Sequence, residues 1–150
     1  MKPEDKDLLL ADLCARLPYG VKYRTIGPSN FAFTLKWIDK LNRLDGEVRL
    51  ENAKIFLRPM SSMTEDEARD IAILHGYNPV EILSTKVTDE YIDIILDDCV
   101  CSTITSTMWY DGIISSLECF DYLNKKMFDF RGLIPKDLAI STEEFNPYKH

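Results

Sequence analysis

Residues 116–134 read SLECFDYLNKKMFDFRGLI, and the rest of the sequence is organised around this stretch. Its large apolar residues recur at steps of three and four, the spacing that places side chains on one side of a helix. They are Leu117, Phe120, Leu123 and Met127, with Asn124 beside them. Beyond the helical part, further apolar surface comes from Phe128, Phe130, Leu133 and Ile134. The stretch therefore predicts an amphipathic helix that runs into an Arg-Gly turn and closes the core of the domain.

The length and composition fit one globular domain over residues 1–150, because 45% hydrophobic content is enough for a core. No apolar run approaches the ~20 residues that span a bilayer. The N-terminal sequence lacks the apolar segment and cleavage site of a secretory signal. We therefore expect a cytoplasmic protein without membrane association, whose four cysteines (Cys14, Cys99, Cys101 and Cys119) are reduced thiols.

The net charge of −7 is unevenly distributed along the chain. Residues 1–50 hold nine basic and seven acidic residues (+2), residues 51–100 four and eleven (−7), and residues 101–150 five and seven (−2). An acidic middle disfavours direct binding to nucleic acid, which requires clustered Lys and Arg. A solvated acidic face is the favoured interpretation. The weaker alternative is an acidic nucleic-acid mimic that occupies a DNA-binding protein.

The N-terminal third predicts a helix followed by strands. Lys2–Leu17 has Pro3 at a first-turn position and leucines at four-residue steps, and Pro18 and Gly20 end it. Alternating patterns then predict a meander of strands with a tight turn at Asp45-Gly46. The third strand is either continuous or broken at Glu51-Asn52. The predicted strands are Val21–Thr25, Phe31–Ile38 (with Phe31, Phe33, Leu35 and Trp37 on its buried side) and Glu47–Leu57.

The middle of the chain predicts a capped helix and a second group of strands. Thr64 and Glu67 form a capping-box pattern before a helix over 65–74, and Gly76 and Pro79 end that helix. The stretches Tyr91–Leu96 and Val100–Thr107 are rich in residues that favour strands, although residues 87–95 also fit a helical face. The predicted fold class is therefore α+β: an antiparallel β-meander packed by an N-terminal helix, a mid-chain capped helix and a C-terminal amphipathic helix. The second strand group forms a small sheet of its own or extends the first.

Two groups of residues could hold a metal ion. Cys99 and Cys101, with Cys119 and His75, suggest zinc, but one residue separates the pair where zinc sites use two to four. The acidic residues of 89–98 could hold Mg²⁺ or supply an acid and a base; they are Asp89, Glu90, Asp93, Asp97 and Asp98. We favour buried thiols and a solvated acidic edge, so the sequence predicts no metal site and no cofactor. A metal-dependent enzyme or factor using either group is the alternative.

The sequence predicts no catalytic residue. A nucleophile needs a base, and the two histidines are the terminal His150 and His75, which is expected to end a helix before Gly76. A binding role is more easily argued, because Arg and aromatic residues often anchor interfaces. Arg131, with Tyr122 and Asn124, is therefore the candidate recognition patch. For Arg131 alone, a structural role in which it ties Asp129 or the helix C-terminal carbonyls is the favoured interpretation.

Three segments carry a resemblance: DLLLADLCARLPYGVK (7–22), LRPMSSMTEDE (57–67) and DYLNKKMFDFRGLI (121–134). They resemble a group of short proteins of gut Bacteroidales genomes and their phages or prophages, which share a PMSSMTE segment and an FD[YF]RGLI ending. Members of that group often carry His-His where this chain has Lys126-Met127, so no histidine role transfers. The resemblance implies a cytoplasmic protein of mobile-element type, and it brings no activity.

Together these patterns predict a small non-enzymatic binding or adaptor protein that acts on another protein. The absence of a convergent catalytic set in the sequence and the acidic, aromatic-containing surface both favour this class over an enzyme.

Overall fold

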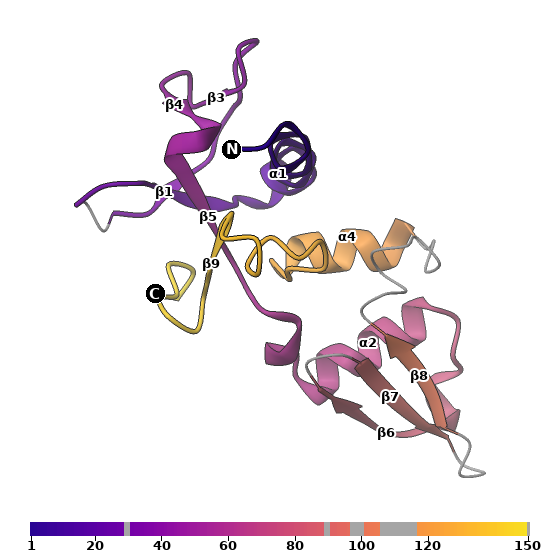
Figure 1. Ribbon diagram of the computed structural model, residues 1–150. Coiled ribbons are helices and arrows are strands. Elements are labelled where there is room, and N and C mark those ends of the chain that lie inside the picture. Colours follow the sequence, from indigo (N-terminus) through magenta and orange to yellow (C-terminus); the bar gives the residue numbers. More distant parts are fainter. Residues whose placement is uncertain (29–30, 89–90, 97–100, 106–116, 150) are drawn as a thin grey trace. The chain divides into compact units, whose positions relative to one another are not determined.

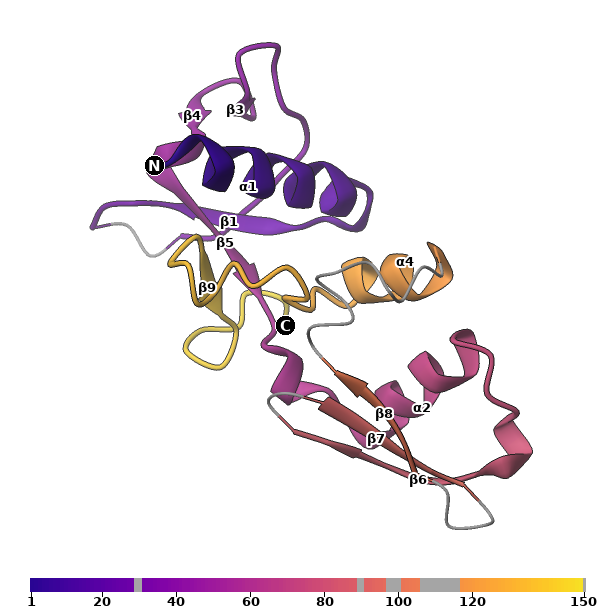
Figure 2. The ribbon, with the colours of Figure 1, turned by 45° about the vertical axis from the view of Figure 1, so that its right-hand side comes forward.

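The computed structural model describes residues 1–28, 31–88, 91–96, 101–105 and 117–149 (Figures 1 and 2). It divides into two compact units: unit 1 is Met1–Arg58 with Asn124–His150, and unit 2 is Pro59–Leu123. Helices and mostly antiparallel strands occur in both, which confirms the α+β class. The organisation as one domain over residues 1–150 remains a prediction. Within the described ranges, no helix is long and apolar enough to cross a membrane.

Unit 1 is built on a four-stranded sheet with the order β2-β1-β5-β9. Strand β1 pairs antiparallel with β2 and β5, and β9 pairs parallel with β5. A separate antiparallel hairpin consists of β3 and β4. The elements of unit 1 are α1 (Pro3–Arg16), η1 (Leu17–Tyr19), β1 (Lys22–Thr25), β2 (Phe33–Thr34), β3 (Arg43–Leu44), β4 (Val48–Arg49), η2 (Leu50–Asn52), β5 (Ala53–Leu57) and β9 (Ala139–Ser141).

Helix α1 covers the sheet of unit 1, as Figure 2 shows. Pro3 opens the helix and Gly20, at φ 72°, ends the following turn of 3₁₀ helix in the left-handed conformation that glycine adopts most readily. Leu9 and Leu13 are buried against the strand residues Tyr23 and Ile55 in one core cluster. The predicted N-terminal helix is therefore confirmed, and its leucine stripe faces the core as expected.

The hairpin β3–β4 confirms the predicted turn. Asp45 and Gly46 both have positive φ values, 51° and 76°, and with Glu47 they form the loop of the hairpin, since Leu44 pairs with Val48. The third strand is broken at Glu51-Asn52, the second of the two predicted alternatives, because η2 separates β4 from β5.

The predicted strand Phe31–Ile38 is wrong in extent and in burial. Only Phe33–Thr34 is strand, at the edge of the sheet, and only Leu35 of the eight residues is buried. The chain leaves the strand after Thr34, so the alternation of apolar residues no longer maps onto the two faces of a sheet. As a result the three aromatic residues of this segment lie exposed: Phe31, Phe33 and Trp37.

Unit 2 contains a helix and a three-stranded antiparallel sheet with the order β6-β7-β8. The second strand group therefore forms a sheet of its own, and the helical alternative for the described part of residues 87–95 is excluded. Strand β6 was not predicted, because a register shift between Ile82 and Ser84 interrupts its alternation. The elements are η3 (Met60–Ser62), α2 (Glu65–Leu74), η4 (Pro79–Glu81), β6 (Ile82–Val87), β7 (Tyr91–Leu96) and β8 (Cys101–Thr105).

Helix α4 (Leu117–Lys125) confirms the C-terminal amphipathic helix, although it ends earlier than the apolar stretch. Leu123 and Asn124 are buried, but Leu117 is 83% exposed, so its predicted place on the buried side is wrong. After α4 the chain turns at Met127, which has a φ of 62°, and Phe128 bridges to Arg58. Gly132, at φ 73°, forms the predicted Arg-Gly turn. Residues 128–134 then close the core of unit 1 with Phe128, Phe130 and Leu133.

The capping box of α2 gives a first testable prediction. The hydroxyl of Thr64 accepts a hydrogen bond from the Glu67 backbone N–H at 3.2 Å, and the Glu67 carboxylate accepts one from the Thr64 N–H at 3.1 Å. We expect Thr64→Ala to lower the free energy of unfolding of unit 2 by about 1 kcal/mol, since the Glu67 N–H loses the hydroxyl that accepts its hydrogen bond. Urea denaturation followed by circular dichroism measures this. The exposed Ser61→Ala is the control, and an equal loss there would refute the cap.

Candidate functional site

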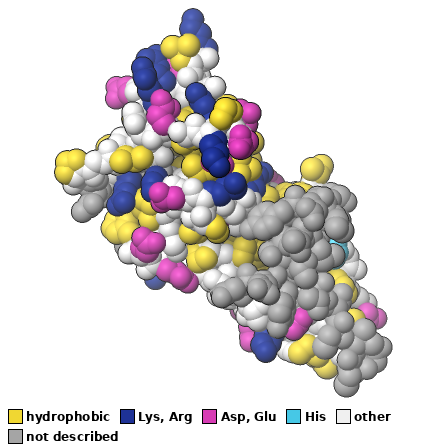
Figure 3. Space-filling model, viewed as in Figure 1, with side chains coloured by type: hydrophobic (Ala, Val, Ile, Leu, Met, Phe, Trp, Pro, Cys, Tyr) yellow, Lys and Arg dark blue, Asp and Glu magenta, His cyan; other side chains and the backbone are white. Residues whose placement is uncertain are grey.

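Exposed apolar side chains concentrate in one short segment of unit 1. Of the ten large hydrophobic residues that are exposed in the described part of the chain, five lie within residues 26–41. Figure 3 shows hydrophobic side chains at the surface over the β1–β2 end of unit 1, at the left of the view. Scattered single exposures are ordinary, so what matters is which of these residues lie together at one place on the surface. The five residues are Ile26, Phe31, Phe33, Trp37 and Leu41.

Two of these residues line a groove of about 470 Å³, which we call the aromatic groove. Phe33 contributes from the edge strand β2 and Trp37 from the segment that follows it; they are 46% and 52% exposed. The groove therefore offers two half-exposed aromatic rings at the strand that ends the order β2-β1-β5-β9. Its lining residues are Ala32, Phe33, Thr34, Lys36, Trp37 and Asp45.

The carboxylate of Asp45 holds the wall of the aromatic groove in place. It accepts hydrogen bonds from the backbone N–H groups of Lys36 (2.9 Å) and Trp37 (3.3 Å) and from the Tyr23 hydroxyl (2.8 Å). The pKa of Tyr23 is raised above its ordinary value. Burial is the largest cause, and the hydrogen bond to the Asp45 carboxylate is the second. The phenol therefore stays protonated and donates. The Tyr23 ring also lies 5.8 Å from the Phe33 ring between centroids. The groove is thus anchored to the core strand β1.

Gly46 fixes the position of the Trp37 ring. A Cβ atom at Gly46 would lie 2.7 Å from two atoms of the indole, so the ring packs directly against the glycine backbone. The positive φ of 76° independently favours glycine at this place. Trp37 is therefore held by the turn and still presents half of its surface to solvent.

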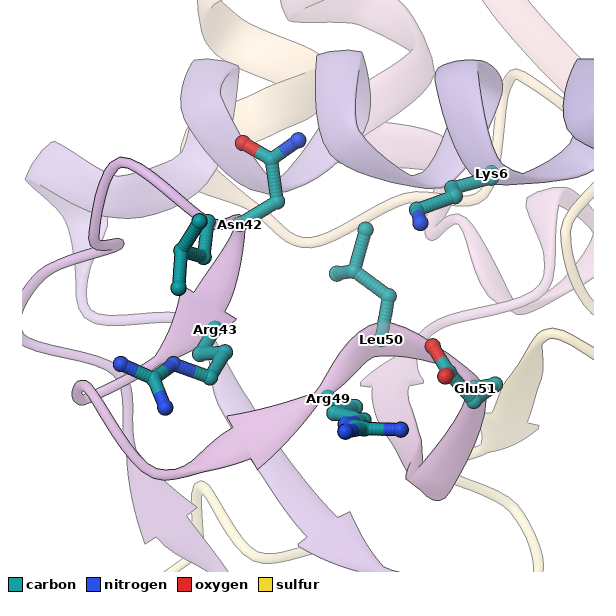
Figure 4. Close-up of a pocket in the computed structure, with 7 residues that line it drawn as sticks. Lys6, Asn42, Arg43, Arg49, Leu50 and Glu51 are labelled. Atoms are coloured by element: carbon teal, nitrogen blue, oxygen red, sulfur yellow. The ribbon is translucent and has the colours of Figure 1, made fainter.

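A second cavity, of about 320 Å³, lies between α1, the β3–β4 hairpin and η2; we call it the cationic pocket (Figure 4). Figure 4 shows Asn42 and Lys6 on the helix side, Arg43, Arg49 and Glu51 opposite, and Leu50 between them. Leu50 is buried and the charged groups form the rim. The lining residues are Lys6, Leu41, Asn42, Arg43, Arg49, Leu50 and Glu51.

Asp39 organises the loop on one side of the cationic pocket. Its carboxylate accepts hydrogen bonds from the backbone N–H groups of Leu41 (2.9 Å) and Arg43 (2.8 Å) and pairs with the Arg43 Nε at 2.7 Å. The backbone hydrogen bond from Arg43 is the main cause that lowers the pKa of Asp39, so the carboxylate stays charged at neutral pH. The Arg43 side chain is oriented through Nε, while 42% of its surface stays exposed.

Unit 1 also contains a buried ionic network that ties α1 to the C-terminal segment. Asp12 and Arg16 are completely buried and form two hydrogen bonds, from Nε at 2.8 Å and from a terminal nitrogen at 2.9 Å. Arg16 also donates to the Phe128 carbonyl at 2.6 Å. Arg131 donates to Asp12 at 2.7 Å and to the Asn124 side chain at 3.2 Å, and its guanidinium lies 4.2 Å from the Phe130 ring centroid.

The structure brings together two of the three residues predicted to form a recognition patch. Arg131 and Asn124 are hydrogen-bonded in unit 1, whereas the Tyr122 hydroxyl belongs to unit 2 and donates to Asp70 at 2.9 Å. Of the two structural ties considered for Arg131, the one to Asp129 is wrong, because Arg131 pairs with Asp12 and Asp129 accepts from the backbone N–H groups of Leu133 and Ile134. A binding role for Arg131, Tyr122 and Asn124 remains a prediction.

The two predicted metal candidates fall largely outside the described residues. This holds for Cys99 and for all of the acidic cluster except Asp93, whose backbone pairs with Lys86 and Thr103. In the described part of the chain, no group of three or more metal-ligating side chains comes together. Within the described residues, Cys14 and Cys119 form no disulfide, and His75 ends α2 as expected.

The two units differ sharply in charge. Unit 1 holds sixteen Lys and Arg against twelve Asp and Glu (+4), and unit 2 holds two against thirteen (−11). The acidic middle seen in the sequence is therefore a property of unit 2, while both cavities described above belong to a unit of the opposite sign. Comparison of the chain with protein-family models, with curated proteins and with solved structures finds no match.

Proposed function

We propose that this chain is a small non-enzymatic binding or adaptor protein that contacts a protein partner through the aromatic groove. The observation that carries this proposal is the pair Phe33 and Trp37, half exposed although Asp45 and Gly46 hold the groove wall in position. A partner that covers these two rings would remove their apolar surface from water, which favours binding.

The chemistry of the groove suits a protein partner. Tryptophan is among the residues that most often dominate binding free energy, and aromatic anchors work best when they are fixed before binding. The three hydrogen bonds to Asp45 supply that fixation. Lys36 adds a cation at the rim, so a partner that places apolar side chains in the groove and a carboxylate beside it would be preferred.

The cellular setting is part of the proposal. The resemblance of residues 7–22, 57–67 and 121–134 to proteins of Bacteroidales phages and prophages supports a mobile-element protein that acts in the cytoplasm on a host or phage protein. An adaptor of this kind needs a surface rather than a reaction centre.

The test is capture of partners from a lysate of the native host, with retained proteins identified by mass spectrometry. We expect one protein near stoichiometric amounts, and we expect Trp37→Ala to weaken its binding by at least roughly 30-fold, equivalent to about 2 kcal/mol. Gly46→Ala should weaken it too, because the new methyl group displaces the indole. Calorimetry with the purified partner measures both effects.

Val80→Ala is the matched control, since Val80 is also exposed and apolar but lies in η4 of unit 2. Capture that survives Trp37→Ala and Phe33→Ala in a folded protein would contradict the groove as the contact surface. Tyr122→Ala in the same assay tests the patch predicted from sequence. Arg131→Ala is less informative there, because it also removes a partner of the buried Asp12.

One observation favours a second candidate, the acidic nucleic-acid mimic. The net charge of −11 on unit 2 is large for a unit of this size and could attract a basic, DNA-binding protein. Such a partner would bind less tightly as salt increases and would be displaced by DNA, and it would be indifferent to Trp37→Ala. Binding to the Trp37→Ala variant and competition with DNA therefore distinguish the adaptor from the nucleic-acid mimic.

A further inference from the structure

We propose that the cationic pocket binds a small organic phosphate whose body carries hydroxyl groups, in the manner of a sugar phosphate. In this proposal, Lys6, Arg43 and Arg49 contact the phosphate, and Glu51 contacts the hydroxyl groups. It is independent of the aromatic groove, so either can fail alone.

The first argument is the supply of free donors. Among the described residues, Lys6 and Arg49 line the cavity without forming an ion pair. The one side-chain hydrogen bond of Arg43 within the same residues uses Nε, which leaves its terminal amino groups available. Guanidinium and ammonium groups together suit a doubly charged phosphate, because a guanidinium donates two parallel hydrogen bonds and an ammonium adds a point charge.

The second argument is that the pocket is organised in advance of any ligand. Lys6 is carried by α1, and Arg43 is fixed by the three hydrogen bonds that Asp39 accepts in its loop. Asn42 holds a φ of 58°, a conformation that asparagine tolerates better than most residues. Donors fixed by the fold lose less entropy on binding than flexible surface side chains do.

The third argument is size and polarity. A volume of about 320 Å³ falls at the lower end of the ~300–1,000 Å³ found for small-molecule sites and exceeds what a lone phosphate ion needs. Glu51 would repel a second anionic group and would accept hydrogen bonds from hydroxyls. Leu50 supplies an apolar floor for the carbon skeleton. These features together select a monophosphate with a hydroxylated body.

The experiment is a titration of the ¹⁵N-labelled full chain with ribose 5-phosphate, with ribose and inorganic phosphate as separate arms. We expect saturable shifts of the amide signals of Asn42, Arg43 and Glu51 with ribose 5-phosphate, and binding at least roughly tenfold weaker in the other two arms. Lys6→Ala and Arg49→Ala should each weaken binding roughly tenfold. Lys149→Ala removes the same charge from an exposed position outside the pocket and should change nothing.

Glu51→Gln distinguishes the two sides of the site. It removes a negative charge while keeping an acceptor, so inorganic phosphate should bind more tightly to this variant than to the wild type. Shifts without saturation, shifts at other residues, or equal loss in Lys149→Ala would overturn the site. Equal binding of inorganic phosphate and ribose 5-phosphate would overturn the assignment of a hydroxylated body, and unchanged phosphate binding in Glu51→Gln would remove the role given to that residue.

Discussion

Asp12→Ala is expected to lower the free energy of unfolding of unit 1 by about 3–5 kcal/mol, a large fraction of the ~5–15 kcal/mol that stabilises a typical domain. Asp12 is fully buried and accepts hydrogen bonds from two arginines, one of which, Arg16, is itself fully buried. Without the carboxylate, the Arg16 guanidinium would lose both of its hydrogen bonds to Asp12, while its bond to the Phe128 carbonyl would stay. A buried cation without its counterion is among the most costly defects a core can hold.

Asp7→Ala is the matched control for this prediction. It makes the same change on the same helix at an exposed position, so the gain in helix propensity from alanine is common to both variants. We expect Asp7→Ala to stay within about 0.5 kcal/mol of the wild type in urea denaturation followed by circular dichroism. Similar stabilities for the two variants would show that the network is not needed for folding.

The double variant Asp12→Ala/Arg16→Ala distinguishes the loss of the ion pair from the loss of side-chain packing. The main cost of Asp12→Ala is expected to be the buried charge of Arg16 without its counterion. In that case, the double variant should lose less free energy of unfolding than the sum of the two single variants. A strictly additive result would instead assign the loss to packing around each side chain. Arg131, whose side chain is 23% exposed, can turn to solvent in either case.

Elements with a complete local signal could be predicted from the sequence. Helix α2 begins and ends where the capping box and Gly76 place it, and β7 has the bounds Tyr91–Leu96 that its β-forming residues indicated. The turn at Asp45-Gly46 was predicted for the same reason, because its residue types suit positive φ values. In each case the deciding information lies within a few neighbouring residues.

Features that depend on distant residues could not be predicted in this way. Arg131 and Asp12 are 119 positions apart, so nothing local indicated that the arginine would be held by α1 rather than by Asp129. Strand β9 has three residues and exists through its parallel pairing with β5. Such short strands have no periodic pattern of their own.

The aromatic groove was missed because an alternating pattern reports geometry and not burial. Phe31, Phe33 and Trp37 alternate as core-facing strand residues do, yet all three are exposed. The usable signal was elsewhere: an Asp-Gly turn a few residues later supplies both the carboxylate that binds the Lys36 and Trp37 N–H groups and the glycine under the indole.

Helix α4 gives the second large prediction, because two of its leucines have opposite environments. Leu123 is fully buried, and we expect Leu123→Ala to cost about 2–5 kcal/mol from lost apolar burial and the cavity left behind. Leu117 is 83% exposed, and we expect Leu117→Ala to stay within about 0.5 kcal/mol of the wild type.

The two variants make the same chemical change in one nine-residue helix, so differences in helix propensity cancel. Thermal and urea denaturation of both, beside the wild type, measures the contrast. A large loss in Leu117→Ala would mean that this side chain is covered in the folded protein, which would restore the four-residue apolar side inferred from the sequence. A large loss in Leu123→Ala alone would place the buried side of α4 at its C-terminal half, where Leu123 is adjacent to Asn124 and leads into the segment that carries Arg131.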